Sequence, residues 1–243
     1  MSHADGRKRL LCAIDTVEFD TAVTLAASLR DVVGGVKLGL EFFTAHGPEG
    51  VAAVAEGGLS VFLDLKYYDI PNTVAGAIRA SVGLNPFMIS VHVGGGPAML
   101  RAAMAASFRV ADQNGGRRPL VVGITVLTSF DDDDVEAVGM KGPLPDQVRR
   151  LADLAQETGL DGVVASAYEI ADLRDQCGDD FVIVVPGIRP AWSSADDQKR
   201  IVTPAEAVRR GADYLVVGRP IIRAEDPPAA ARRIVEDVAG VIA

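Results

Sequence analysis

The stretch "SVFLDLKYYDIPNTV", residues 60–74, joins an apolar run to a proline-led segment through a cluster of charged side chains. The run at its start is typical of a buried strand, and Pro71 opens a segment with the apolar spacing of a helix. Asp64, Lys66 and Asp69 lie between the two. Because burying a charge is costly unless it is paired, this clustering indicates a functional site at the end of a strand.

The same order of strand and helix recurs along the whole chain. Eight apolar runs alternate with eight segments of helical periodicity, and the runs are LLCAID, GGVKLG, SVFLDL, PFMISVHV, PLVVGITVL, DGVVAS, FVIVVPGI and DYLVVGR. Strands that are apolar on both faces belong in a parallel sheet covered by helices. Eight such units in 243 residues predict a single-domain α/β protein, a (β/α)8 TIM barrel over residues 1–243. An open doubly wound sheet is the alternative, and residues 1–8 are expected to form a flexible tail.

The composition excludes several classes of protein. The net charge of -9 (24 basic and 33 acidic residues) provides no field for a nucleic-acid backbone or an anionic membrane surface. Two distant cysteines, Cys12 and Cys177, predict reduced thiols, and the absence of a signal core or a long apolar span predicts a cytoplasmic protein. The acidic run at 131–134 is expected to be a solvated loop or a helix start, because it lacks the spacing of metal ligands.

Charged residues end the first three predicted strands. Asp15 ends the first, Lys37 the second, and Asp64 with Lys66 the third, so all four are expected at the carboxyl-end rim where barrels keep their active sites. Asp64 and Lys66 are two residues apart and project to the same side of an extended chain. A purely structural ion-pair network is the alternative. His92, on the fourth strand, is expected to be a hydrogen-bonded structural residue.

A second cluster follows the last two predicted strands. "PGIRP" at 186–190 and "VGRP" at 217–220 each place a glycine and an arginine in a loop that often binds phosphate in barrels. The expected phosphate-binding residues are Gly187, Arg189, Gly218 and Arg219, with Gln198 as an amide donor. The small and polar segment "AWSSADDQ", residues 191–198, has the composition of a lid over such a site.

These motifs together resemble the orotidine 5′-monophosphate decarboxylase family. "FLDLKYYDIPNTV" matches the family signature D-x-K-x-x-D-I-P-x-T, and "VPGIRP", "ADDQKRIVTPAEAVRRGADY" and "LVVGRPI" extend the match to the end of the chain. Tyr68 departs from the pattern, since many relatives carry histidine there. The resemblance implies a TIM barrel that converts orotidine 5′-monophosphate to UMP without metal or organic cofactor. It also implies a homodimer with shared active sites.

The resemblance assigns a role to each matching residue. Lys66 is the implied catalytic lysine and Asp64 its carboxylate neighbour, while Lys37 and Asp15 are implied to contact the ribose hydroxyls. The remaining implied roles are a reach into the partner's site for Asp69 and Thr73, a place beside the pyrimidine for Thr128, and phosphate binding for Arg189, Gln198, Gly218 and Arg219. The catalytic set is therefore Asp64, Lys66, Asp69 and Lys37.

Two other functions remain open at this stage. A sugar-phosphate decarboxylase or hexulose-phosphate synthase of the same superfamily shares D-x-K-x-x-D, usually employs Mg²⁺, and lacks the I-P-x-T continuation. A non-catalytic barrel that binds nucleotides as a regulator belongs to a different class. The intact Asp64, Lys66 and Asp69 argue against the second alternative, because binding alone does not require that set.

Overall fold

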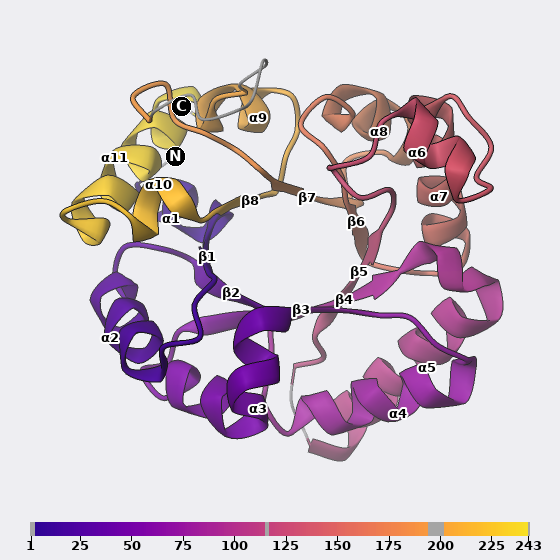
Figure 1. Ribbon diagram of the computed structural model, residues 1–243, viewed down its shortest axis with the longest axis horizontal. Helices are drawn as coiled ribbons and strands as arrows, with labels where there is room; N and C mark the ends of the chain where they lie inside the picture. Colours follow the sequence, from indigo (N-terminus) through magenta and orange to yellow (C-terminus); the bar gives the residue numbers. More distant parts are fainter. Residues whose placement is uncertain (1–2, 115–116, 194–201, 243) are drawn as a thin grey trace. The chain divides into compact units, whose positions relative to one another are not determined.

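The strands of the computed structural model, which describes residues 3–114, 117–193 and 202–242, form a closed barrel in chain order (Figure 1). They are parallel wherever their pairing is described. This confirms the predicted (β/α)8 barrel over the open sheet. The strands are β1 Leu10–Ile14, β2 Gly35–Gly39, β3 Ser60–Tyr67, β4 Met88–His92, β5 Leu120–Ile124, β6 Gly162–Val164, β7 Val182–Pro186 and β8 Tyr214–Val217.

Helices alternate with these strands, as the periodicity predicts. They are α1 His3–Arg9, α2 Phe19–Leu29, α3 Leu40–Ala55, α4 Pro71–Val82, α5 Gly96–Asn114, α6 Asp132–Ala137, α7 Leu144–Glu157, α8 Ile170–Cys177, α9 Pro204–Arg209, α10 Arg219–Ile222 and α11 Pro227–Ile242, with a 3-10 turn η1 at Val93–Gly95. Within the described residues, none of these helices has the length and apolar character needed to cross a membrane.

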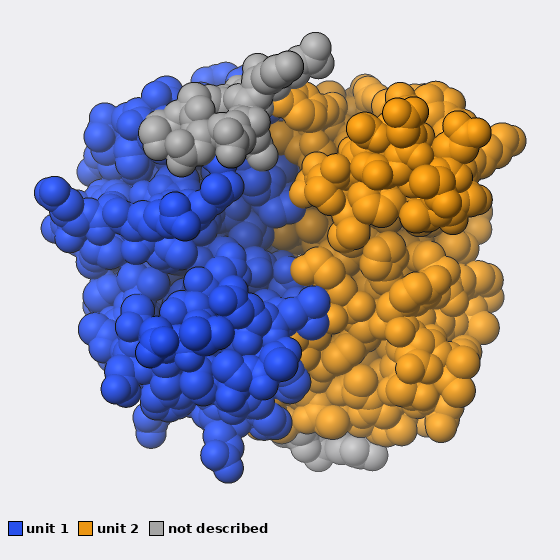
Figure 2. All heavy atoms as spheres, viewed as in Figure 1, with its two compact units in different colours: residues 1–64, 185–243 blue, residues 65–184 orange. Residues whose placement is uncertain are grey.

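The chain divides into two compact units, which Figure 2 colours separately. The first comprises residues 1–64 and 185–243, and the second comprises residues 65–184. One boundary falls within β3, between Asp64 and Leu65, and the other falls within β7. The expectation of a single domain therefore stays a prediction.

In the first unit, the strand register brings the charged strand ends level with one another. Ala13 of β1 pairs with Lys37 of β2, and Gly39 at the end of β2 pairs with Asp64 of β3. The intervening apolar residues, such as Leu38 and Leu63, are fully buried. Burial of these side chains fixes the register, because a slip by one residue would turn each strand's apolar set to the wrong face.

The amino-terminal segment, predicted to be a flexible tail, contains a helix. Residues His3–Arg9 form α1, and Arg7 donates from Nε to the Val33 carbonyl at 3.2 Å and from Nη2 to the Arg30 carbonyl at 2.9 Å. Gly6 lets this helix lie close to α11, since a Cβ there would come within 2.9 Å of the Val235 carbonyl oxygen. The polar sequence HADGRKR is thus ordered by backbone contacts that its composition does not reveal.

The acidic run begins a helix, as one of its two expected roles. Asp131 is the N-cap of α6: its Oδ1 accepts the Asp134 amide at 3.0 Å, and Asp134 Oδ2 accepts the Asp131 amide at 3.2 Å. This reciprocal pair is a capping box, in which two helix-terminal donors are satisfied at once. Asp132 Oδ1 accepts the Leu144 amide at 2.7 Å and ties the start of α6 to that of α7.

Candidate active site

Lys37 lies between two carboxylates at the ends of the first three strands. Its Nζ is 3.5 Å from Asp15 Oδ1 and 3.5 Å from Asp64 Oδ2. The side chains of Lys37 and Asp64 are only 13% and 9% exposed, whereas that of Asp15 is 52% exposed. Gly39 leaves room for the ammonium, because a Cβ at this position would lie 3.1 Å from Nζ. The structure thus brings together three of the residues that the sequence placed on the rim.

The loop after β8 approaches the same cluster. A Cβ on Gly218 would lie 3.4 Å from the Ala13 Cβ and 3.9 Å from Asp15 Oδ2. Gly218 therefore permits a close approach to the end of β1, and Arg219 follows it as the first residue of α10. The two sequence clusters of this unit, one at the start of the chain and one near its end, lie next to each other.

A cavity of about 220 Å³ opens beside Arg219. Its lining residues share a basic or neutral character and are Arg189, Trp192, Ser193, Arg219, Pro220, Arg223 and Ala224. Among the described residues, three guanidinium groups and no carboxylate line it, which is the composition of an anion pocket.

The loop after β7 shapes one side of this pocket. Arg189 is 8% exposed, and its amide donates to the Val202 carbonyl at 3.4 Å. Gly187 has φ +76°, in the region that favours glycine, where the chain turns off β7. Trp192 lies under the Arg233 guanidinium of α11, 4.7 Å from its carbon to the ring centroid. Gln198 and most of the expected lid lie outside the described residues.

In the second unit, Lys66 has an unusual backbone. Its φ is +52°, the left-handed region that non-glycine residues seldom occupy. Its amide donates to Ser90 Oγ at 2.9 Å, and Ser90, on β4, is fully buried. The backbone near the end of β3 is therefore hydrogen-bonded to a side chain of β4, the next strand in the chain.

His92 lies near Lys66 at the end of β4. Its ring packs at a tilt of 37° against that of Tyr68, with the ring centroids 5.4 Å apart, and the Tyr68 hydroxyl donates to the Gly94 carbonyl at 3.4 Å. Burial lowers the pKa of His92, and the Lys66 charge lowers it further, so the ring is neutral at pH 7. The ring was expected to be hydrogen-bonded, and its buried Nδ1 has no hydrogen-bond partner among the described residues.

Asp69, Thr73 and Thr128 are exposed on their own unit. Asp69 Oδ1 accepts the Ile70 amide at 2.6 Å, and Ile70 itself is the N-cap of α4 without a side-chain capping bond. Asp69 therefore does not cap α4, although it lies close to the start of that helix. Ile70 beside it is 67% exposed. Thr128 lies in the turn that follows β5.

Sequence reasoning missed Ser90, Trp192, Arg223 and Gly39. Ser90 had a weak signal, since it interrupts the apolar strand "MISVH" two residues before His92. Arg223 follows Arg219 by four residues, a helical spacing that could have marked both for the same pocket.

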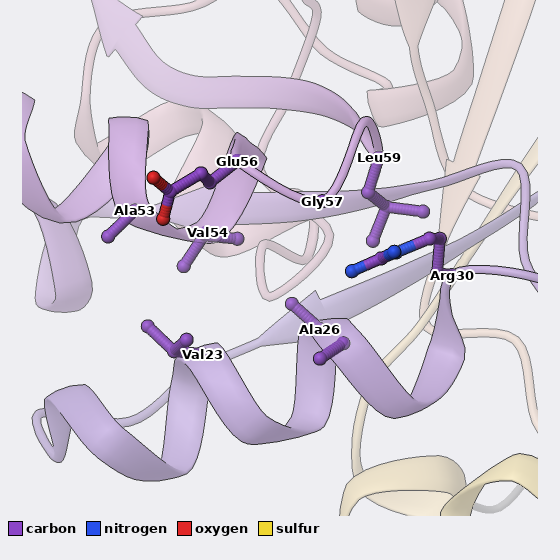
Figure 3. Close-up of a pocket in the computed structure, with 9 residues that line it drawn as sticks. Val23, Ala26, Arg30, Ala53, Val54, Glu56, Gly57 and Leu59 are labelled. Atoms are coloured by element: carbon purple, nitrogen blue, oxygen red, sulfur yellow. The ribbon is translucent and has the colours of Figure 1, made fainter.

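Another cavity, of about 260 Å³, lies between α2 and α3 (Figure 3). Val23 and Ala26 of α2 face Val54 of α3 across it, with Arg30 and Glu56 at its edges. Arg30 comes before β2, so this end of the cavity is at the amino ends of the strands, away from the charged rim. Among the described residues, no group of three or more His, Cys, Asp or Glu has the arrangement of a metal site.

The chain forms a (β/α)8 barrel with an ionic cluster at its strand ends and an arginine-lined pocket after its last strands. These features define the class of barrel enzymes that act on small anionic substrates. Comparison with known sequences narrows this class. Residues 8–234 match the model of the orotidine 5′-phosphate decarboxylase / HUMPS family, and the chain belongs to this family.

Individual relatives agree with this assignment. The chain is 54% identical over 229 residues to an orotidine 5′-phosphate decarboxylase of Rhodospirillum rubrum, covering 94% of this chain and 93% of the relative. It is 48% identical over 239 residues to one of Moorella thermoacetica, covering 98% and 95%. The crystal structure of orotidine 5′-phosphate decarboxylase from Lactobacillus acidophilus is similar with a TM-score of 0.83 at 34% identity, covering 94% of this chain and 98% of that one. The resemblance inferred from the motifs is confirmed.

Proposed function

We propose that the chain decarboxylates orotidine 5′-phosphate to UMP and CO2, as a carboxy-lyase of pyrimidine biosynthesis. Relatives that match the chain at 46–54% identity over nearly their whole length are named orotidine 5′-phosphate decarboxylase. The observation that carries the proposal is the charged end of β3, where Asp64 is held 3.5 Å from the Lys37 ammonium and Lys66 follows two residues later. Position and charge at this strand end suit the stabilisation of a carbanion.

The chemistry needs a fixed positive charge. When the bond between C6 and the carboxylate breaks, the electron pair stays on C6 in an sp² orbital that the ring carbonyls cannot delocalise. A protonated Lys66 stabilises that pair more in the transition state than in the substrate, and then transfers its proton to C6. Solvent returns a proton to the lysine. No organic electron sink takes part in these steps.

The other charged residues orient this lysine and the substrate. Asp64, two residues before Lys66 on β3, serves to aim its ammonium in this proposal, and Asp69 adds a further negative charge. Lys37 and Asp15 bind the ribose hydroxyls, and Lys37 suits this role because two carboxylates hold it in place. Thr128 lies beside the pyrimidine in this proposal.

The phosphate is bound by Arg189, Gln198, Gly218 and Arg219. The arginine-lined pocket of about 220 Å³ supports this assignment for Arg189 and Arg219, because a guanidinium binds phosphate oxygens in a bidentate manner. Phosphate binding far from the reacting bond serves catalysis when its free energy holds the pyrimidine against Lys66.

We further propose that the enzyme is a cytoplasmic homodimer in which Asp69 and Thr73 complete the partner's site. Asp69 is exposed on its own unit, and the large side chains of Tyr68 and Ile70 on either side of it are 64% and 67% exposed. Apolar side chains exposed to this degree around a charged residue favour a covered interface.

The direct test is the production of UMP from orotidine 5′-phosphate by the purified chain. Lys66→Ala is expected to lose nearly all turnover while its circular dichroism spectrum stays that of the parent. A Lys66→Ala protein within tenfold of the parent rate would contradict the mechanism. Activity that disappears in EDTA and returns with Mg²⁺ would favour the metal-using relatives, and UMP binding without turnover would favour a regulatory barrel.

Subunit complementation tests the shared site. Inactive Lys66→Ala and inactive Asp69→Ala proteins are mixed, and exchange of subunits is followed by native mass spectrometry. In a mixed dimer one site carries both lesions and the other carries neither, so activity is expected to reappear. Verified exchange without activity would show that Asp69 acts within its own subunit.

A further inference from the structure

We propose that Ser90 is a positioning residue for Lys66, which it holds in a backbone conformation that the lysine would not adopt by itself. The inference rests on the proposed function, since it concerns the lysine that faces C6. It adds a residue outside the D-x-K-x-x-D segment to the machinery of the reaction.

The backbone of Lys66 is the first observation. Its φ of +52° lies in the left-handed region, where a Cβ is crowded and where glycine or asparagine is the usual residue. Such a conformation persists only where the surroundings fix it, and it is concentrated at functional sites. Within the strand that precedes it, the residues from Val61 to Leu65 are buried. The turn at Lys66 thus redirects the chain at the point where β3 leaves the core.

The contact with Ser90 is the second observation. Ser90 Oγ accepts the Lys66 amide at 2.9 Å, and Ser90 is 0% exposed. An extended residue would direct its amide to a backbone carbonyl of a neighbouring strand, whereas the amide of Lys66 donates to a side-chain hydroxyl, which holds it in its turned orientation. Water does not reach a fully buried hydroxyl from bulk solvent, so loss of this acceptor leaves the amide without an easy substitute.

A residue close to Lys66 lies on the same strand as Ser90. His92 follows Ser90 by two residues on β4, so both project to the same side of that strand. The Lys66 charge acts on the His92 ring, whose buried Nδ1 has no hydrogen-bond partner among the described residues.

The test separates aim from stability and from binding. We compare the parent with Ser90→Ala, which removes the acceptor, and with Ser90→Thr, which keeps a hydroxyl. Ser107→Ala is the matched control, because Ser107 is another fully buried serine of the same unit and its Oγ has no hydrogen-bond partner among the described residues. Should Ser90→Ala not fold, Ser90→Cys keeps the volume with a much weaker acceptor and is judged by the same criteria.

Four quantities are measured for each protein. They are kcat and KM for orotidine 5′-phosphate, the Kd of UMP, and the Kd of 6-hydroxy-UMP, which carries an anionic oxygen at C6 where Lys66 would face it. A misplaced catalytic group costs roughly 10- to 100-fold in rate. Ser90→Ala is therefore expected to lower kcat by that factor, with KM and the Kd of UMP within about twofold of the parent.

The anionic analogue gives a readout that a merely structural role would not move. Ser90→Ala is expected to weaken 6-hydroxy-UMP at least about tenfold, Ser90→Thr to recover most of the loss, and Ser107→Ala to match the parent. A kcat within threefold of the parent, or equal losses for UMP and 6-hydroxy-UMP, would overturn the assignment. If the parent itself forms no UMP, the proposed function is wrong. If the parent is active and Ser90→Ala is equally active, only the role of Ser90 is wrong.

Discussion

Replacing Lys37 by methionine removes the cation that two carboxylates share while keeping the length of the side chain. At 3.5 Å, the attraction between Lys37 and Asp64 amounts to about 5 kcal/mol at an effective dielectric constant of about 20. Part of this is offset, because a side chain only 13% exposed loses hydration when the pair forms. The contribution of Asp15 is smaller still, since its side chain is 52% exposed and screened by solvent.

We therefore expect Lys37→Met to lower the free energy of unfolding by about 3 kcal/mol, measured by urea titration with far-ultraviolet circular dichroism. Asp15→Asn is the matched control at the exposed side of the cluster and should cost less than about 1 kcal/mol. The double variant Lys37→Met/Asp64→Asn should recover at least half of the loss, because it removes the carboxylate that the lysine neutralised. A Lys37→Met protein within about 0.5 kcal/mol of the parent would refute the assigned role of this ion pair.

Three further outcomes are expected. Gly39→Ala should keep the fold and lower kcat roughly tenfold, because the added Cβ would lie only 3.1 Å from the Lys37 ammonium and would push it aside. Steady-state kinetics, with an unchanged melting temperature, checks this prediction, and full activity would contradict it. Arg223→Ala should weaken UMP several-fold and leave uridine unchanged in calorimetry, since Arg223 lines the anion pocket; equal losses would show that it does not contact the phosphate. Burial, with a smaller effect of Asp15, raises the pKa of the Cys12 thiol to about 12, so Cys12 should resist iodoacetamide at pH 8 until urea is added, as mass spectrometry of the labelled peptide would show.

The strands were predictable because burial on both faces leaves a strong trace in the sequence. Seven of the eight apolar runs contain the whole strand that the structure shows, and the third, SVFLDL, ends two residues before β3 does. The register then follows from which residues must face the core. The ionic cluster around Lys37 was predictable for the same reason, because a charge at the end of a buried strand needs an oppositely charged partner close by.

Backbone conformation was harder to predict. The periodicity of PEGVAAVAEGG, residues 48–58, predicts a helix that starts at Pro48, whereas α3 starts at Leu40 and kinks at Gly47, where φ is +57°. The sequence signals favoured a helix start at the proline and gave no indication of the turns before it. The identity of residue 66 gives no indication of a left-handed backbone, and the contact of its amide with Ser90 comes from another strand.

The left-handed backbone of Lys66 places stability and activity in conflict at one position. Glycine or asparagine would occupy φ +52° with less steric crowding, so selection for heat resistance alone should favour them at residue 66. Selection for turnover keeps the lysine, and the rest of the barrel must offset its cost. Engineers who seek a more durable enzyme should hold residue 66 fixed and look for gains elsewhere, because here the stabilising choice and the working choice are different amino acids.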